Sequence, residues 1–173
     1  GWAASLLGSY ATELNVVGWS IGGTPSNVTG TFYGLDGSLF SGFSVAGVAG
    51  IVDSYPEVND YVGSVITPAG NAALQFTREH CMGDIVVGLQ NVNLTGKDFV
   101  KNEKNFLTDK RIAPILDHLT MGTDSKLTPR VPVYMYHALH DEVIPFDRAN
   151  QTANAWCKDC LLYTSPSPRD QRG

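Results

Sequence analysis

The residues best suited to chemistry lie in one segment, 137–145, which reads His-Ala-Leu-His-Asp-Glu-Val-Ile-Pro. It follows a run of apolar and aromatic residues, 129–137, that predicts a strand. Asp141 therefore lies just past the carboxyl end of a strand, where the active sites of open α/β sheets form. A carboxylate held there can accept the Nδ1–H of a histidine and stabilise the imidazolium during nucleophilic catalysis. We interpret Asp141 as a candidate triad acid, with a turn cap as the alternative role.

The histidines of the chain are better explained by structural roles than by catalysis. We expect His137 to support the loop of Asp141 by hydrogen bonding. His137, His140 and Asp141 need not converge on a metal ion, and no other cluster completes a coordination sphere, so we expect no metal site. His80 and His118 fall in segments with helical patterns, and we interpret them as structural or surface residues.

We expect no serine of the chain to act as a nucleophile, because the Gly-x-Ser-x-Gly sequence at 18–22 overlaps the apolar run 15–21 and is not at the strand-to-helix turn that a nucleophile elbow requires. Cys157 and Cys160 form a C-x-x-C pair, but no second pair of ligands accompanies them. A redox C-x-x-C opens a helix, whereas Cys157 closes the helix expected over 146–157. We therefore expect no redox centre and no cofactor.

Composition and charge exclude several classes of protein. The 173 residues carry 17 acidic and 12 basic side chains, a net charge of −5, so the basic surface of a nucleic-acid-binding protein is absent. The longest apolar stretches are broken by glycine and are shorter than the ~20 residues of a membrane span. Three N-x-[ST] sequons, at Asn27, Asn93 and Asn150, are possible glycosylation sites and indicate the secretory route.

The hydrophobic pattern predicts an α/β core. Residues 2–14 have apolar side chains at helical spacing, and the short apolar run 15–21 that follows is typical of a buried parallel strand. The segment 129–137 restores a strand, and 146–157 predicts a helix with Pro145 near its first turn. This order indicates part of a doubly wound sheet. We expect Asp141 at the sheet edge where both strands end.

An all-helical insertion separates the two halves of this core. Thr67 can cap a helix that has Pro68 at its first position, and the Gly- and Ala-rich segment 39–55 allows close approach of helices or a ligand. Helices are expected over 56–66, 69–81, 82–89, 97–106 and 112–121. The predicted organisation is core over 1–25, helical insertion over 26–128 and core over 129–159.

Both ends of the chain are unusual. The sequence starts at Gly1 without a Met or a charged signal-peptide segment, so we expect processing or truncation to have removed the natural start. From Cys160 the sequence resembles the translation of a transposase-type sequencing adapter, with a disordered Ser/Pro-rich tail as the alternative. We expect residues 160–173 to be a non-native tail that packs against nothing, and the chain to be an internal fragment.

Five segments resemble the fungal secretory lipases. They are Gly-Trp-Ala-Ala-Ser-Leu at 1–6, Tyr-Ala-Thr-Glu-Leu-Asn-Val-Val-Gly at 10–18, Gly-Gly-Thr-Pro at 22–25, Phe-Ser-Gly-Phe-Ser-Val-Ala-Gly-Val-Ala-Gly at 40–50 and His-Ala-x-x-Asp-Glu-x-x-Pro at 137–145. The similarity runs from Gly1 to about Asp159. It implies a fragment of an α/β-hydrolase fold, with the insertion as a helical cap over the active site.

The resemblance also implies an activity. The intact parent would be a secreted, extracellular triacylglycerol lipase or carboxylester hydrolase that acts on lipid or ester substrates at an oil–water interface. Asp141 would be the acid of its Ser/His/Asp triad, with the serine upstream of Trp2 and the histidine beyond Asp159. The triad Ser and His would then be absent from this chain, which alone would be inactive.

Small residues of the insertion would leave room for an acyl chain, with close helix packing as the alternative; they are Ala46, Gly47, Ala49 and Gly50. Cys81 and Cys157 match family cysteines, and their pairing stays open.

Two other interpretations of the function remain: an α/β hydrolase of another substrate class, such as a peptidase or polyester hydrolase, or a non-catalytic lipid-binding relative. A Gly-x-Ser-x-Gly before Gly1 and a histidine after Asp159 in the full-length transcript would favour the lipase.

Overall fold

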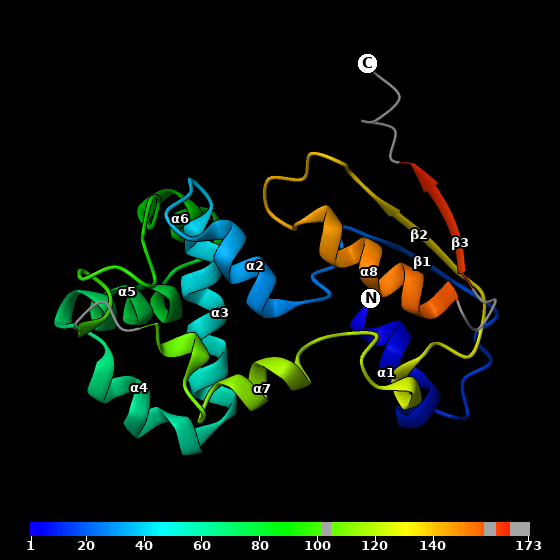
Figure 1. Cartoon of the computed structure of the whole chain (residues 1–173), viewed down its shortest axis with the longest axis horizontal. Helices are drawn as coiled ribbons and strands as arrows, with labels where there is room; N and C mark the ends of the chain where they lie inside the picture. The colour runs from blue at the N-terminus through cyan, green and yellow to red at the C-terminus, as the bar shows by residue number, and fades with distance from the viewer. Residues whose placement is uncertain (102–104, 158–161, 167–173) are drawn as a thin grey trace. The chain divides into compact units, whose positions relative to one another are not determined.

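The chain leaves one folding unit at Gly30 and returns to it at His118. The computed structural model describes residues 1–101, 105–157 and 162–166 (Figure 1). The first unit comprises the described residues of Gly1–Gly30 and His118–Gly173, and the second unit is Thr31–Asp117. The second unit contains fewer residues than the predicted insertion, 26–128, because residues 26–30 and 118–128 belong to the first unit.

A three-stranded parallel sheet forms the centre of the first unit. Its strands are β1 (Trp19–Gly22), β2 (Val133–His137) and β3 (Leu162–Pro166), in the order β1-β2-β3. Residues of β2 alternate between buried and exposed, with Val133 and Met135 facing the core and Tyr134 exposed. Helix α8 (Phe146–Cys157) contacts β2 and β3 and has Trp156 buried in the core (Figure 1). The helix predicted over 146–157 is confirmed with the same bounds. The strand predicted over 129–137 is confirmed at its end, His137, but begins four residues later than predicted, at Val133.

The first helix and strand are shorter than the apolar pattern predicted. Helix α1 (Trp2–Tyr10) ends four residues before Leu14, and the backbone N–H of Leu14 bonds the carbonyl of Ala11 in a turn instead. Strand β1 begins at Trp19, and Val17 is 81% exposed. The apolar run 15–21 is therefore only partly a buried strand, because pairing with β2 starts where Trp19 meets Val133.

The expectation that residues 160–173 pack against nothing is wrong for residues 162–166. These residues form β3, parallel to β2, with Cα partners from Val133↔Leu162 to His137↔Pro166. A strand edge presents unpaired N–H and C=O groups that another extended segment can bond, and α8 returns the chain to that edge. The rest of the predicted tail, 160–161 and 167–173, lies outside the described residues, and its non-native origin stays a prediction.

The second unit is built from short helices around α3 (Ser41–Ser54). The other described helices of this part of the chain are α2 (Val28–Leu35), η1 (Pro56–Val58), α4 (Asn59–Val65), α5 (Pro68–Glu79), α6 (Met82–Gly88), η3 (Phe106–Thr108) and α7 (Ala113–His118). Of these, η1, α4, α5 and α6 contact α3. The predicted cap of α5 is confirmed, because Thr67 Oγ1 accepts a hydrogen bond from Gly70 N at 3.0 Å. A final short helix, η4 (Ser125–Leu127), belongs to the first unit.

The helix predicted over 97–106 is not formed at residues 97–100, and its residues 102–104 lie outside the described ranges. Within 97–106, residues 97–99 form turns, and Val100 makes an isolated antiparallel bridge with Ile66. Phe99, Val100 and Phe106 are all buried, so their apolar spacing reflects contacts with other segments. The helix expected over 112–121 is also shorter, since α7 ends at His118.

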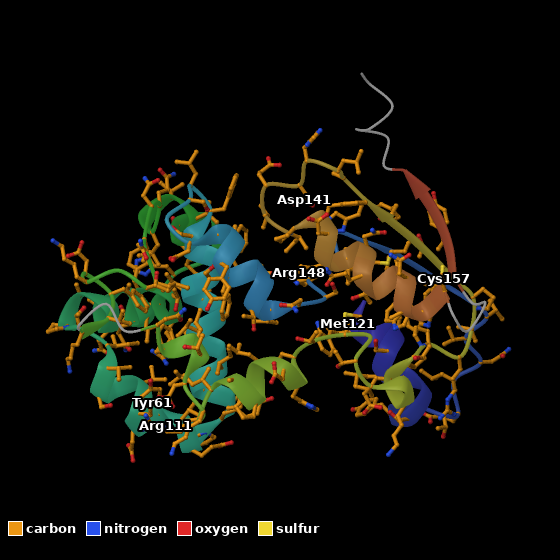
Figure 2. All side chains as sticks on the ribbon, in the orientation of Figure 1. Tyr61, Arg111, Met121, Asp141, Arg148 and Cys157 are labelled. Carbon is orange, nitrogen blue, oxygen red and sulfur yellow. The ribbon has the colours of Figure 1, made fainter. Side chains whose placement is uncertain are left out.

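Two ion pairs lie on the surface of the second unit. Arg111 lies over the ring of Tyr61, 3.5 Å from its centroid, and bonds Asp109 with Nε–Oδ1 at 2.7 Å (Figure 2). The Arg111 guanidinium holds the pKa of the Asp109 carboxyl well below its usual range, and burial raises the pKa of Tyr61. Arg78 lowers the pKa of Asp53 in the same way, through a hydrogen-bonded pair.

The segments that enter and leave the second unit are bonded to each other within the first unit. Asn27 and Thr120 form an isolated antiparallel bridge. On either side of it, Val28 N donates to Leu119 O at 3.4 Å, and Met121 N donates to Ser26 O at 2.7 Å. The exit from the first unit and the return to it are therefore neighbours.

Candidate functional site

Asp141 lies in the loop that follows β2, as the sequence predicted (Figure 2). β2 ends at His137 and α8 begins at Phe146, so the loop spans residues 138–145. Because β1 and β2 are parallel neighbours, both strands end at the edge of the sheet that carries Asp141. The predicted position is confirmed, whereas the catalytic role stays a prediction.

The carboxylate of Asp141 is held by the backbone of its own loop. Its Oδ1 accepts hydrogen bonds from Val143 N at 3.0 Å and Ile144 N at 2.8 Å. Bonds from two amides to one oxygen fix the orientation of the carboxylate and are stronger than neutral hydrogen bonds because the acceptor is charged. The side chain as a whole is 22% exposed.

His137 supports this loop, as predicted. Its Nε2 lies 2.9 Å from the carbonyl oxygen of Ile144, and since a carbonyl only accepts, Nε2 carries the proton. The same nitrogen lies 3.4 Å from Asp141 Oδ2. The side chain of His137 is buried beside the ring of Phe146, and its Nδ1 has no hydrogen-bond partner in the described part of the chain. His137 therefore ties the end of β2 to the end of the loop.

Two buried hydroxyls at the same edge of the sheet were not singled out from the sequence. Thr24 and Ser26 follow the carboxyl end of β1, each is 1% exposed, and neither hydroxyl has a hydrogen-bond partner among the described residues. Gly23 turns the chain into this segment with a φ of +53°. Thr24 also packs against Gly1, where a Cβ would clash with it. The Gly-Gly-Thr-Pro sequence is the signal that could have identified them.

The small residues proposed for an acyl chain differ in their surroundings. All lie on α3 in the second unit. A Cβ at Gly47 would lie 2.6 Å from the ring of Phe32, so this glycine allows close packing within the unit. Ala49 is buried and Ala46 is half-buried, whereas Gly50 is exposed with no atom within 4 Å of a Cβ placed there. Gly50 is thus the residue around which space is open.

The remaining candidates are spread over the molecule. Asn93 and Asn150 are exposed and Asn27 is half-buried. Cys81 and Cys157 are exposed free thiols, and Cys160 lies outside the described residues. Across residues 1–101, 105–157 and 162–166, no group of three or more His, Cys, Asp or Glu side chains could hold a metal ion. No helix in those ranges is long and apolar enough to cross a bilayer.

The chain is similar to known proteins of one family. The family model described as secretory lipase matches residues 1–164. The chain is 99% identical over 158 residues to the secreted triacylglycerol lipase LIP5 of Malassezia globosa, which covers 91% of the chain and 33% of that protein. It is 45% identical over 159 residues to the secreted triacylglycerol lipase LIP1 of Malassezia furfur, covering 92% of the chain and 33% of that protein. The chain thus spans about a third of the length of these relatives.

Solved structures agree on the fold. Candida antarctica lipase A superposes with a TM-score of 0.88 at 32% identity, over 96% of this chain and 40% of that one. The rice cell wall degrading esterase LipA from Xanthomonas oryzae superposes with a TM-score of 0.71 at 9% identity, over 94% of the chain and 46% of that one, which supports the fold alone. The parallel sheet with its helices is thus part of an α/β-hydrolase fold, and the chain belongs to the secretory lipase family.

Proposed function

We propose that this chain is the part of a secreted triacylglycerol lipase that supplies the acid of its Ser/His/Asp triad, Asp141, together with the helical cap. The observation that carries the proposal is the Asp141 carboxylate. Its Oδ1 accepts hydrogen bonds from Val143 N and Ile144 N, and the side chain is 22% exposed, so Oδ2 is free of these backbone bonds. A triad acid needs this arrangement, because it must be rigid and must accept one further hydrogen bond from histidine Nδ1–H.

His137 does not fit the role of the catalytic base. A triad histidine presents Nδ1–H to the acid and Nε2 to the serine, but His137 directs Nε2 to the loop of Asp141 and is buried. We therefore propose that the base and the nucleophilic serine are contributed by parts of the protein outside this chain. This agrees with the chain spanning about a third of its relatives.

The proposed reaction uses the acid through the base. The histidine accepts the serine proton as serine Oγ attacks the ester carbonyl, and Asp141 stabilises the resulting imidazolium. The histidine then gives the proton to the departing alcohol, which leaves an acyl-enzyme. Water attacks the acyl-enzyme by the same route and releases the fatty acid. Asp141 keeps its charge throughout.

Hydrolysis assays test the proposed activity. We expect the full-length protein to release fatty acids from emulsified triacylglycerols and to lose this activity with a serine-directed phosphonate, because the acyl-enzyme requires a free serine. The 173-residue chain alone should match a heat-treated control, because the triad members act as a unit. Hydrolysis of peptides but not esters by the full-length protein would overturn the substrate class, and hydrolysis by the short chain would place the nucleophile within it.

We also propose that α3 contributes to binding of the acyl chain through Ala46, Gly47 and Gly50. The open space at Gly50 supports this and also makes it the cleanest position to test. Gly50→Trp should lower kcat/KM for palmitoyl esters at least about tenfold relative to butyryl esters, since lost apolar contacts of this size are worth about 1–3 kcal/mol.

Gly63→Trp is the matched control for this substitution. Gly63 is an exposed glycine of α4 in the same unit, and it too has no atom within 4 Å of a Cβ placed there. Both variants carry the same helix-propensity change, so a loss of stability alone would affect them equally. Equal chain-length profiles for Gly50→Trp, Gly63→Trp and the unmodified protein would remove Gly50 from the acyl site.

A further inference from the structure

We propose that Asn93 carries an N-linked glycan in the folded protein and that Asn27 remains unmodified. This inference rests on the secretory route in the proposed function, but not on lipase activity. Both residues head an N-x-T sequon, so the sequence does not distinguish them. Their surroundings in the structure do.

The sequon at Asn93 forms a turn that leaves its amide nitrogen available. Asn93 Oδ1 accepts a hydrogen bond from Thr95 N at 3.0 Å and lies 3.0 Å from Thr95 Oγ1. The side chain is exposed, and its Nδ2 makes no hydrogen bond within the described ranges. Nδ2 is the atom to which the sugar is attached. A glycan there leaves every hydrogen bond of the turn in place.

The turn is held to the rest of its unit by groups other than Asn93. Asp36 accepts hydrogen bonds from Leu94 N at 2.5 Å and from Thr95 Oγ1 at 2.9 Å. Leu94 is fully buried, which anchors the middle residue of the sequon. The folded loop therefore presents Asn93 outward whether or not the residue is modified.

Space for the first sugar lies beside Asn93. The residue borders a cavity of about 290 Å³ that is also lined by Ala69, Ala73, Val92 and Phe99. A sugar linked to Nδ2 can occupy this space or extend into solvent without displacing a side chain. The site therefore has room for a bulky group beside Asn93.

Asn27 is half-buried, whereas Asn93 is exposed. Its Oδ1 accepts a hydrogen bond from Gly30 N at 2.6 Å, and its backbone bridges Thr120. Arg148 lies against the same turn, since a Cβ placed on Gly30 would be 2.8 Å from Arg148 Nε and 3.1 Å from Asn27 Oδ1 (Figure 2). A glycan at this half-buried asparagine would have to displace Arg148 or open the bridge.

The modification itself is a group transfer from a lipid-linked oligosaccharide diphosphate. Asn93 Nδ2 forms a bond to the anomeric carbon of the first sugar as the bond from that carbon to the diphosphate oxygen breaks. The lipid diphosphate leaves with the bonding electrons, and Nδ2 loses one proton to a base of the transferase. No oxidant or reductant is needed.

Peptide mapping of the full-length protein, purified from the medium of a fungal host, tests the proposal. Release of glycans by an amidase in ¹⁸O water converts each glycosylated Asn into labelled Asp. Trypsin places Asn93 in the peptide 79–97 and Asn27 in the peptide 1–78 or its upstream extension, so the two sites are read separately. We expect label at Asn93 and none at Asn27. An unlabelled Asn93, or a labelled Asn27 in the folded monomer, would overturn the proposal.

Two variants show that the signal depends on the sequon. Asn93→Gln should abolish the label and the glycan mass at this site. Thr95→Ser keeps both the sequon and the hydroxyl that bonds Asp36, so it should retain the label. A glycan that persists in Asn93→Gln would place the modification at another residue and refute the assignment. Both readouts are independent of hydrolysis, so they stand whether or not the lipase proposal holds.

Discussion

Asp141→Asn is expected to lower kcat of the full-length protein for ester hydrolysis by about 10⁴, as an acid-to-amide change does in a serine protease. The amide donates a hydrogen bond where the carboxylate accepted one, so the histidine is held in the wrong tautomer. The loop should keep its shape, because asparagine Oδ1 can still accept from Val143 N and Ile144 N. The measurement is kcat with a soluble ester, together with the thermal midpoint.

Asp147→Asn is the matched control for this substitution. Asp147 is an exposed carboxylate in the first turn of α8, six residues further along the chain. It makes the same change of charge near the site without touching the carboxylate of Asp141. A decrease in kcat common to both variants would mean that net charge matters and not the triad. Unchanged turnover in Asp141→Asn would remove Asp141 from the catalytic machinery.

Trp156→Ala is expected to lower the free energy of unfolding by about 3–5 kcal/mol, the usual cost of truncating a large buried aromatic residue. Trp156 is 1% exposed and lies in the core cluster that joins α8 to the sheet. The other members of this cluster are Ile21, Met121, Val133, Met135, Ala149 and Ala153. Equilibrium unfolding in urea measures the change.

Two companion variants show where this loss comes from. Trp156 Nε1 has no hydrogen-bond partner among the described residues, so Trp156→Phe removes volume but no hydrogen bond and should cost less than Trp156→Ala. Asn154→Ala, at an exposed position of the same helix, should change stability by no more than about 0.5 kcal/mol. A loss for Trp156→Ala no larger than that for Asn154→Ala would contradict the assignment of α8 to the core.

The parts of the fold that were predictable depend on local signals. Pro145 and the apolar spacing that follows it define α8, and the bounds Phe146–Cys157 were predicted without error. Thr67 and Pro68 likewise mark the start of α5. These signals act within one helical turn, so they do not depend on the rest of the chain.

The parts that failed depend on contacts between distant segments. Apolar spacing continues to Leu14, but α1 ends at Tyr10 and Leu14 is 55% exposed. The apolar spacing around Val100 predicted a helix over 97–106, but Val100 forms a backbone bridge with Ile66, which lies 34 residues earlier in the chain. Residues 162–166 were predicted to make no contacts because the segment resembles an adapter sequence, but they form β3. The edge of β2 offers backbone hydrogen bonds to any extended segment beside it, and α8 leads the chain to that edge.

The candidate site shows the same division. Asp141 was identifiable because strand, acid and helix follow one another in the sequence, and the support from His137 was predicted from its place at the end of the strand. The buried hydroxyls of Thr24 and Ser26 were missed, since their burial depends on α1 and on the return of the chain near Met121. Spacing within the sequence does not report such contacts.

The antiparallel bridge between Asn27 and Thr120 makes the helical insertion an exchangeable module. Cα atoms paired across such a bridge lie about 4.5–5.5 Å apart, a gap that a two-residue hairpin turn can close. We therefore expect that the 87 residues from Thr31 to Asp117 can be shortened, lengthened or replaced while the paired strand ends beside Asp141 keep their register.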